Sequence, residues 1–160
     1  LVYNNQTRKT TNYPGVDIRV PGFGDTSTLE IIDPHFLAPH PLGVQLRHHP
    51  WTEYYKDIVT ALVEVGYVRN ISVRGAPYDF RKAPNELQDY YANLKHLIEE
   101  TYEINDETKT TIVCHSMGCP IMSYFLNTID QTWKDKYIKG MITIGGAWGG
   151  AVKAMKTITA

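Results

Sequence analysis

The stretch TTIVCHSMGCPIMSYFLN, residues 110–127, constrains the fold more than any other part of the sequence. A run of apolar, strand-forming residues ends at the tetrapeptide HSMG, and a second apolar run begins at once. This change of pattern predicts a strand at 110–115, a sharp turn, and a helix at about 117–128. Pro120 suits the helix, because the first helical turn has no intrahelical partner for its N–H. We therefore expect a strand that leads directly into a helix.

The rest of the chain alternates predicted strands with predicted helices. We expect strands at 16–20, within 67–77 and at 138–144, and helices at about 53–65 and 84–104. Thr52 would cap the helix at 53–65, and Gly66 would end it. The strand cores are apolar throughout, as is typical of strands covered by helices on both faces. The pattern predicts an α/β protein with a mostly parallel sheet.

Size and charge exclude several classes of protein. The chain has 160 residues, which fits one domain, and a formal net charge of -1 without a block of like charges. We therefore expect no nucleic-acid partner and no electrostatic membrane anchor. No run of apolar residues is long enough to span a bilayer. The first residues, LVYNNQTRKT, lack the regions of a signal peptide and are typical of the interior of a longer protein.

The cysteines and histidines give no sign of a metal site. Cys114 and Cys119 flank the HSMG turn, and because we predict them on different elements we expect no structural disulfide. We interpret Cys114 as a buried strand residue that packs in the core, and Cys119 as a thiol on the following helix. The histidines at positions 35, 40, 48 and 49 lie in a predicted loop, 34–51, and their spacing matches no standard zinc pattern.

Two glycosylation sequons indicate passage through the secretory route. They are Asn5-Gln6-Thr7 and Asn70-Ile71-Ser72, so Asn5 and Asn70 are candidate glycan sites. Such triplets arise often by chance, and together they favour a lumenal or secreted protein.

Ser116 is the candidate nucleophile. A nucleophile elbow, usually written G-x-S-x-G, places a serine on a sharp turn between a strand and a helix. Gly118 occupies the later small position, and Cys114 stands in the earlier one. The N-terminus of the following helix would favour a developing oxyanion. The alternative is that Ser116 merely caps the helix. The predicted strand before it and helix after it favour the nucleophile.

Several longer stretches resemble the lecithin:cholesterol acyltransferase family. They are RVPGFGDTSTLEIIDP, VRGAPYDFRKAPNE, CHSMGC, YFLN and WKDKYIKGMITIGGAWGG, and the resemblance covers nearly the whole chain. The family usually has Ala or Gly at Cys114, Pro at Ala147 and Trp at Phe80. The resemblance implies an α/β-hydrolase fold and a Ser-Asp-His triad with Ser116 as nucleophile. It implies removal of a fatty acyl chain from a glycerophospholipid at a membrane or lipoprotein surface, and its transfer to water or to a lipid alcohol.

The partners of Ser116 are expected outside this chain. His115 projects to the opposite face of the strand from its neighbour and cannot serve Ser116 as base. In this fold the acid and then the histidine follow the serine, yet all six histidines stand at or before position 115. After Ser116 the aspartates are Asp130 and Asp135, and neither follows the strand at 138–144. The resemblance places acid and base downstream of Ala160, and a lid and a membrane-contact region upstream.

The mechanism that the resemblance implies needs no metal and no cofactor. The backbone N–H of Met117 would be one oxyanion donor, and N–H groups would polarise the ester carbonyl. Two alternatives remain open: a non-catalytic lipid-binding protein of the same fold, and a general soluble carboxylesterase. A downstream acid and histidine would separate the enzymes from the binding protein. The family-specific stretches separate the lipid enzyme from the esterase.

Overall fold

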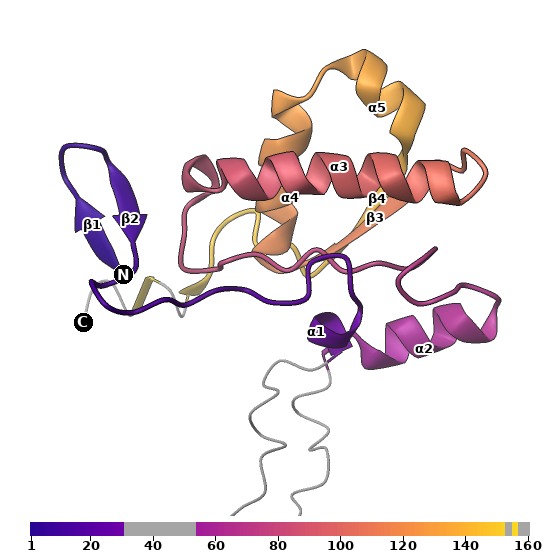
Figure 1. Cartoon of the computed structure of the whole chain (residues 1–160), viewed down its shortest axis with the longest axis horizontal. Coiled ribbons are helices and arrows are strands. Elements are labelled where there is room, and N and C mark those ends of the chain that lie inside the picture. The colour runs from indigo at the N-terminus through magenta and orange to yellow at the C-terminus, as the bar shows by residue number, and fades with distance from the viewer. Residues whose placement is uncertain (31–53, 153–154, 157–160) are drawn as a thin grey trace, which may run out of the picture. The chain divides into compact units, whose positions relative to one another are not determined.

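The computed structural model describes residues 1–30, 54–152 and 155–156. The chain divides into two compact units, Leu1–Arg81 and Lys82–Ala160. Figure 1 labels their helices and strands. The predicted 34–51 loop with its histidines, and the predicted cap Thr52, lie outside the described residues. The expectation that the whole chain belongs to one domain stays a prediction.

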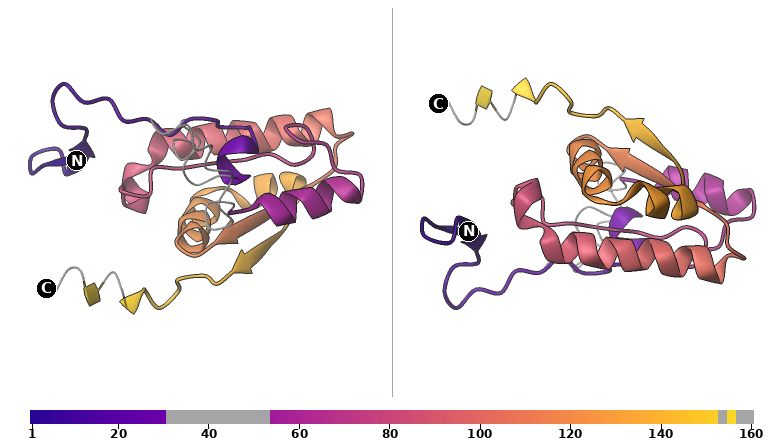
Figure 2. Two further views of the ribbon diagram at one scale, coloured as in Figure 1. Left: turned by 90° about the horizontal axis from the view of Figure 1, so that it is seen from below. Right: turned by 90° about the horizontal axis from the view of Figure 1, so that it is seen from above.

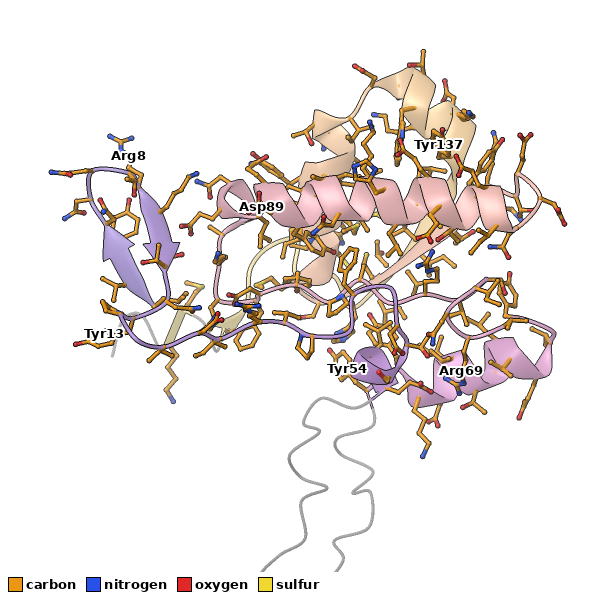
Figure 3. All side chains as sticks on the ribbon, viewed as in Figure 1. Arg8, Tyr13, Tyr54, Arg69, Asp89 and Tyr137 are labelled. Carbon is orange, nitrogen blue, oxygen red and sulfur yellow. The ribbon has the colours of Figure 1, made fainter. Side chains whose placement is uncertain are left out.

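The first unit opens with a short hairpin that the sequence did not predict. Strand β1 (Val2–Asn4) pairs antiparallel with β2 (Lys9–Thr11). The Asn4 side-chain oxygen accepts the backbone N–H groups of Gln6 and Thr7, at 2.9 and 3.0 Å, which shapes the turn. Figure 3 shows Arg8 at the tip of this hairpin. Strands of three residues that bury little carry no hydrophobic period for a sequence pattern to detect.

Two helices follow in the first unit. They are α1 (Ser27–Glu30) and α2 (Lys56–Glu64). Helix α2 begins later than predicted, and its N-cap Tyr55 makes no side-chain cap bond. Gly66 ends the helix as predicted, with a left-handed φ of +102° and its N–H bonded to the Val63 carbonyl. An ion pair between Arg69, labelled in Figure 3, and Glu30 ties the turn after α2 to α1.

Two of the predicted strands are wrong. Residues 16–20 form no strand, and their apolar side chains Val16, Ile18 and Val20 are 46%, 53% and 40% exposed. Residues 68–73 form a tight turn, because both Ser72 and Val73 donate their N–H groups to the Val68 carbonyl. A strand needs a neighbouring strand for its backbone groups, and within the described residues neither segment joins a sheet; residues 68–73 form only an isolated bridge between Arg69 and Val73. A local sequence pattern that suits a strand is therefore not sufficient at either place.

The second unit has the predicted α/β order. A 3-10 turn, η3 (Pro84–Glu86), leads into α3 (Gln88–Ile104), so the predicted helix at 84–104 is interrupted at Leu87. Then come β3 (Thr110–His115), α4 (Gly118–Thr128), α5 (Gln131–Tyr137) and β4 (Ile138–Ile144). Strands β3 and β4 pair in parallel, which confirms an α/β fold with a parallel sheet. Helices α4 and α5, of which α5 was not predicted, form the crossover that parallel strands require.

A helical core supports the sheet from one side. Both views of Figure 2 show α3 running beside β3 and α4. Phe125 on α4 is 0% exposed; its ring stacks on Tyr91 of α3 at 5.8 Å and meets Trp133 of α5 edge-on at 6.0 Å. The other buried side chains of α3 and α4 are Leu94, Leu97, Ile98, Cys119, Ile121 and Met122.

The opposite face of the sheet is exposed within this unit. Val113, Ile142 and Ile144 share that face in the parallel register and are 39%, 54% and 37% exposed. The sequence pattern predicted helices on both faces of the sheet, but within the described residues of the second unit helices cover only one face.

Candidate active site

Ser116 lies on a strained turn between β3 and α4. Its φ is +49°, a left-handed conformation that costs a non-glycine residue on the order of 1–3 kcal/mol. Its N–H donates to the Ile144 carbonyl at 3.0 Å, and its own carbonyl accepts N–H groups from Cys119 at 3.1 Å and Ala147 at 3.3 Å. These bonds hold the strained backbone from three sides. We call residues 115–118, which they fix, the serine turn.

Ser116 does not cap the helix. The N-cap of α4 is Met117, with φ of -62°, and no side chain makes a cap hydrogen bond there. A capping serine would have extended backbone and would accept an N–H from the first helical turn. The alternative reading of Ser116 as a cap therefore fails on geometry, and the strain at this position needs another explanation.

Met117 presents a backbone donor at the same turn. Among the residues that the structure describes, no acceptor is found for its N–H. It stands at the N-terminus of α4, where the helix dipole favours negative charge. Both features suit an oxyanion donor, the role that the sequence predicted for Met117.

His115, Asp130, Asp135 and His96 are the described residues to consider as base or acid for Ser116. The His115 ring lies over Gly145, since a Cβ built on that glycine would stand 3.9 Å from Nε2. Asp130 is the N-cap residue of α5, and the Asp135 carboxylate accepts the side-chain N–H of Gln131 at 2.7 Å. His96 lies on α3 with Nδ1 3.5 Å from a Glu99 carboxylate oxygen. None of these contacts joins a histidine or an aspartate to Ser116.

The loop after β4 packs tightly against the serine turn. Gly145 has a left-handed φ of +53° and starts the loop. A Cβ added to Gly146 would stand 3.2 Å from Cys119 Cβ and 2.5 Å from Trp148 Nε1. Trp148 is 56% exposed and can move aside, whereas Cys119 is 0% exposed and cannot. Gly146 therefore allows the close approach that lets Ala147 donate to Ser116, a role that the sequence reasoning missed.

We expect Gly146→Ala to destabilise this contact, because its Cβ would meet the Cβ of buried Cys119 at 3.2 Å. Overpacking against a fixed neighbour costs about 1–3 kcal/mol. The matched control is Gly149→Ala, because a Cβ at Gly149 meets nothing within 4 Å. Urea unfolding of the two full-length variants measures the difference. Equal stabilities would show that the loop does not depend on a glycine at position 146.

The two thiols lie closer together than the sequence predicted. Cys114 Sγ is 3.0 Å from Cys119 Sγ and 3.6 Å from the Ile142 carbonyl oxygen, and both cysteines are free and buried. Their placement on different elements does not separate them, because the serine turn folds the start of α4 back onto the end of β3. Burial, followed by the contact with Cys119, raises the pKa of the Cys114 thiol to about 12.

Two features are absent from the described residues. In that part of the chain, no group of three or more His, Cys, Asp or Glu side chains could hold a metal ion. None of its helices is long and apolar enough to cross a bilayer.

Comparison with known proteins gives consistent matches. Residues 1–160 match the family model described as lecithin:cholesterol acyltransferase. A lysosomal phospholipase A and acyltransferase of Rattus norvegicus is 43% identical over 159 residues, covering 99% of this chain and 35% of the relative. The protein of the same name in Homo sapiens is 42% identical over 158 residues, with the same two shares. A phosphatidylcholine-sterol acyltransferase of Gallus gallus is 43% identical over 158 residues, again covering 99% and 35%. The chain spans about a third of the length of these relatives.

Proposed function

Because the chain belongs to the lecithin:cholesterol acyltransferase family, we propose that the full-length protein is a serine-dependent lipid acyl hydrolase and O-acyltransferase. It removes a fatty acyl chain from a glycerophospholipid and passes the chain to water or to a lipid alcohol. Relatives whose names state phospholipase and acyltransferase activities support this reaction class. The observation that carries the assignment of the site is the left-handed backbone of Ser116, held by three hydrogen bonds.

The proposed fold is the α/β-hydrolase fold. In that fold the nucleophile stands at the carboxyl end of a parallel strand, on the turn that leads into a helix. Ser116 follows β3 immediately, and β4 runs parallel beside β3 in register through His115 and Ile144. The strand, the strained turn and the helix of this chain fit that arrangement.

The proposed mechanism uses an acyl-serine. Ser116 Oγ attacks the ester carbonyl carbon while a downstream histidine, oriented by a downstream aspartate, takes its proton. The Met117 N–H donates to the oxyanion that forms. The tetrahedral intermediate expels the lysophospholipid oxygen as an alkoxide, which takes the proton from the histidine and becomes a hydroxyl. Water or a lipid alcohol then attacks the acyl-serine by the same route and restores Ser116.

Labelling and substrate comparison test the proposal. Treat the full-length protein with a fluorophosphonate, which reacts with activated serines, and locate the adduct by peptide mapping. The adduct is expected on Ser116; labelling confined to another serine would overturn the assignment.

The second experiment compares substrates. The full-length protein is supplied with phosphatidylcholine vesicles that carry a labelled acyl chain, with and without a long-chain alcohol. Acyl transfer is expected from vesicles. Turnover confined to short, water-soluble esters would favour the carboxylesterase, and no turnover on either substrate would favour the binding protein.

We also propose that the protein acts in the lysosomal lumen or along the secretory route. The names of the mammalian relatives place those proteins in lysosomes. Asn5 is exposed in the turn of the β1–β2 hairpin, where a glycan has free access. Asn70 is exposed too, but its side-chain oxygen accepts the N–H of buried Thr26 at 2.9 Å. The Asn70 side chain also contacts Asp25. Hydrogen bonds from Ser27, and a further one from Asn70, hold the pKa of the Asp25 carboxyl below its ordinary value.

We expect the two candidate glycan sites to differ when each asparagine becomes glutamine. In protein expressed in secretory cells, each change should remove one glycan, measured as a mass shift with an N-glycosidase. In protein made without glycans, Asn70→Gln should lower stability by about 1–2 kcal/mol, because it loses the bond to Thr26 and places glutamine at φ of +63°. Asn5→Gln, the matched control, should have no effect. The role assigned to Asn70 is wrong if both unglycosylated variants unfold alike.

A further inference from the structure

The buried thiols beside Ser116 form a pair of their own. Cys114 is 5% exposed and Cys119 is 0% exposed, and their sulfurs lie 3.0 Å apart. They stand on the two elements that the serine turn joins, the end of β3 and the first turn of α4. The proposed mechanism uses neither thiol. A disulfide needs a sulfur separation of about 2.0 Å, so closing the pair requires a movement of about 1 Å.

We propose that hydrogen peroxide oxidises Cys114 and Cys119 to a disulfide that bridges the serine turn and reversibly suppresses acyl transfer. The part of this proposal that concerns acyl transfer rests on the proposed function; the disulfide itself does not. A peroxide is the class of oxidant that suits the site, because it is close to water in size and both sulfurs are buried.

The reaction balances with one peroxide. One thiolate attacks a peroxide oxygen and breaks the O–O bond, which gives a sulfenic acid and, with the thiol proton, a water molecule. The second sulfur attacks the sulfenic sulfur. The S–S bond forms, the S–O bond breaks, and hydroxide leaves with the second thiol proton as another water. Two thiols are oxidised, and one peroxide is reduced to two waters.

The expected effect on catalysis follows from the position of Met117. Cys119 lies on the same helical turn as Met117, so drawing its sulfur toward β3 shifts the Met117 N–H. A misplacement of about 1 Å in a catalytic arrangement costs on the order of 100-fold in rate. We therefore expect turnover to fall about 100-fold in the disulfide form and to recover with dithiothreitol.

The rate of oxidation should depend on pH. The thiolate is the reactive form of cysteine, and burial raises the pKa of Cys114 to about 12. The thiolate fraction therefore rises with pH throughout the range below that value. Oxidation should be slowest at acidic pH and faster at neutral and alkaline pH, so the pair should stay reduced in an acidic compartment.

Peptide mapping tests the disulfide directly. Treat the full-length protein with hydrogen peroxide, denature it, alkylate it with iodoacetamide and digest it with trypsin. Cleavage after Lys109 and Lys134 releases one peptide with both cysteines. Untreated protein should give this peptide with two labels. Oxidised protein should give it unlabelled and lighter by two hydrogen atoms than the unlabelled reduced peptide. Two labels after peroxide treatment, or cysteines that gain oxygen instead, would overturn the proposal.

Turnover is measured on the same samples. Dithiothreitol does not reduce methionine sulfoxide, so recovery on its addition excludes Met117 or Met122 as the cause. Cys114→Ala cannot form the disulfide, so peroxide should cause no loss of turnover that dithiothreitol reverses. If Cys114→Ala does not fold, Cys119→Ala takes its place. A disulfide without loss of turnover would disprove the effect on catalysis. If the proposed function is wrong, the protein shows no turnover before peroxide treatment. Peptide mapping then still decides whether the disulfide forms.

Discussion

Ser116→Ala in the full-length protein is expected to lower acyl-ester turnover roughly 10⁶-fold, the scale for losing the nucleophile of a serine hydrolase. The reason is positional. The Ser116 backbone is held at φ of +49° by hydrogen bonds to Ile144, Cys119 and Ala147, and none of them involves the side chain. Removing the hydroxyl therefore deletes the attacking atom and leaves the turn in place.

The measurement is release of a labelled fatty acid from phosphatidylcholine vesicles, alongside urea unfolding of the same sample. Ser123→Ala is the matched control, because Ser123 lies on α4, the helix that follows Ser116, and is half-buried like Ser116. The control should keep its turnover, and both variants should remain folded. If Ser116→Ala keeps a tenth of the wild-type turnover, Ser116 is not the nucleophile.

The parts of the fold that the sequence predicted are those fixed by local pattern. Residues 110–128 were predicted closely, because an apolar strand, a Gly-containing turn and an apolar helix follow one another without a break. Gly66 ended α2 as expected, because a helix end depends on nearby residues. Residues 16–20 show the limit: their alternation suits a strand, but a strand also needs a partner strand, and the described residues supply none.

The candidate site likewise contains residues that the sequence predicted and residues that it did not. Ser116 and Met117 could be predicted because a short motif gives their place on the turn. The groups that hold the turn could not, since Ile144 and Ala147 reach it through the pairing of β3 with β4, about thirty residues along the chain. The contact between Cys114 and Cys119 was missed for a related reason: sequence places two residues on two elements, and the fold at the turn decides how near they come.

The core that supports the serine turn depends on one aromatic side chain. Phe125→Ala is expected to destabilise the full-length protein by about 3–5 kcal/mol, the usual cost of emptying a buried phenylalanine site. Its ring is fully buried and contacts Tyr91 from α3 and Trp133 from α5, so its loss opens a cavity where three helices meet. Trp133 is itself tied to α3 by a 2.7 Å bond from its indole N–H to Glu99, which limits how far the helices can close the gap.

Urea unfolding of Phe125→Ala beside Phe80→Ala checks this prediction. Phe80 is 74% exposed in the described structure, so its truncation should change the unfolding free energy by no more than about 0.5 kcal/mol. Turnover of the folded fraction gives a second test. Helix α4 begins at the serine turn and carries Phe125 in its last turns, so a helix that settles into the cavity should misplace the Met117 N–H as well. Equal losses of stability in the two variants would mean that the contacts of Phe125 with α3 and α5 do not hold this core together.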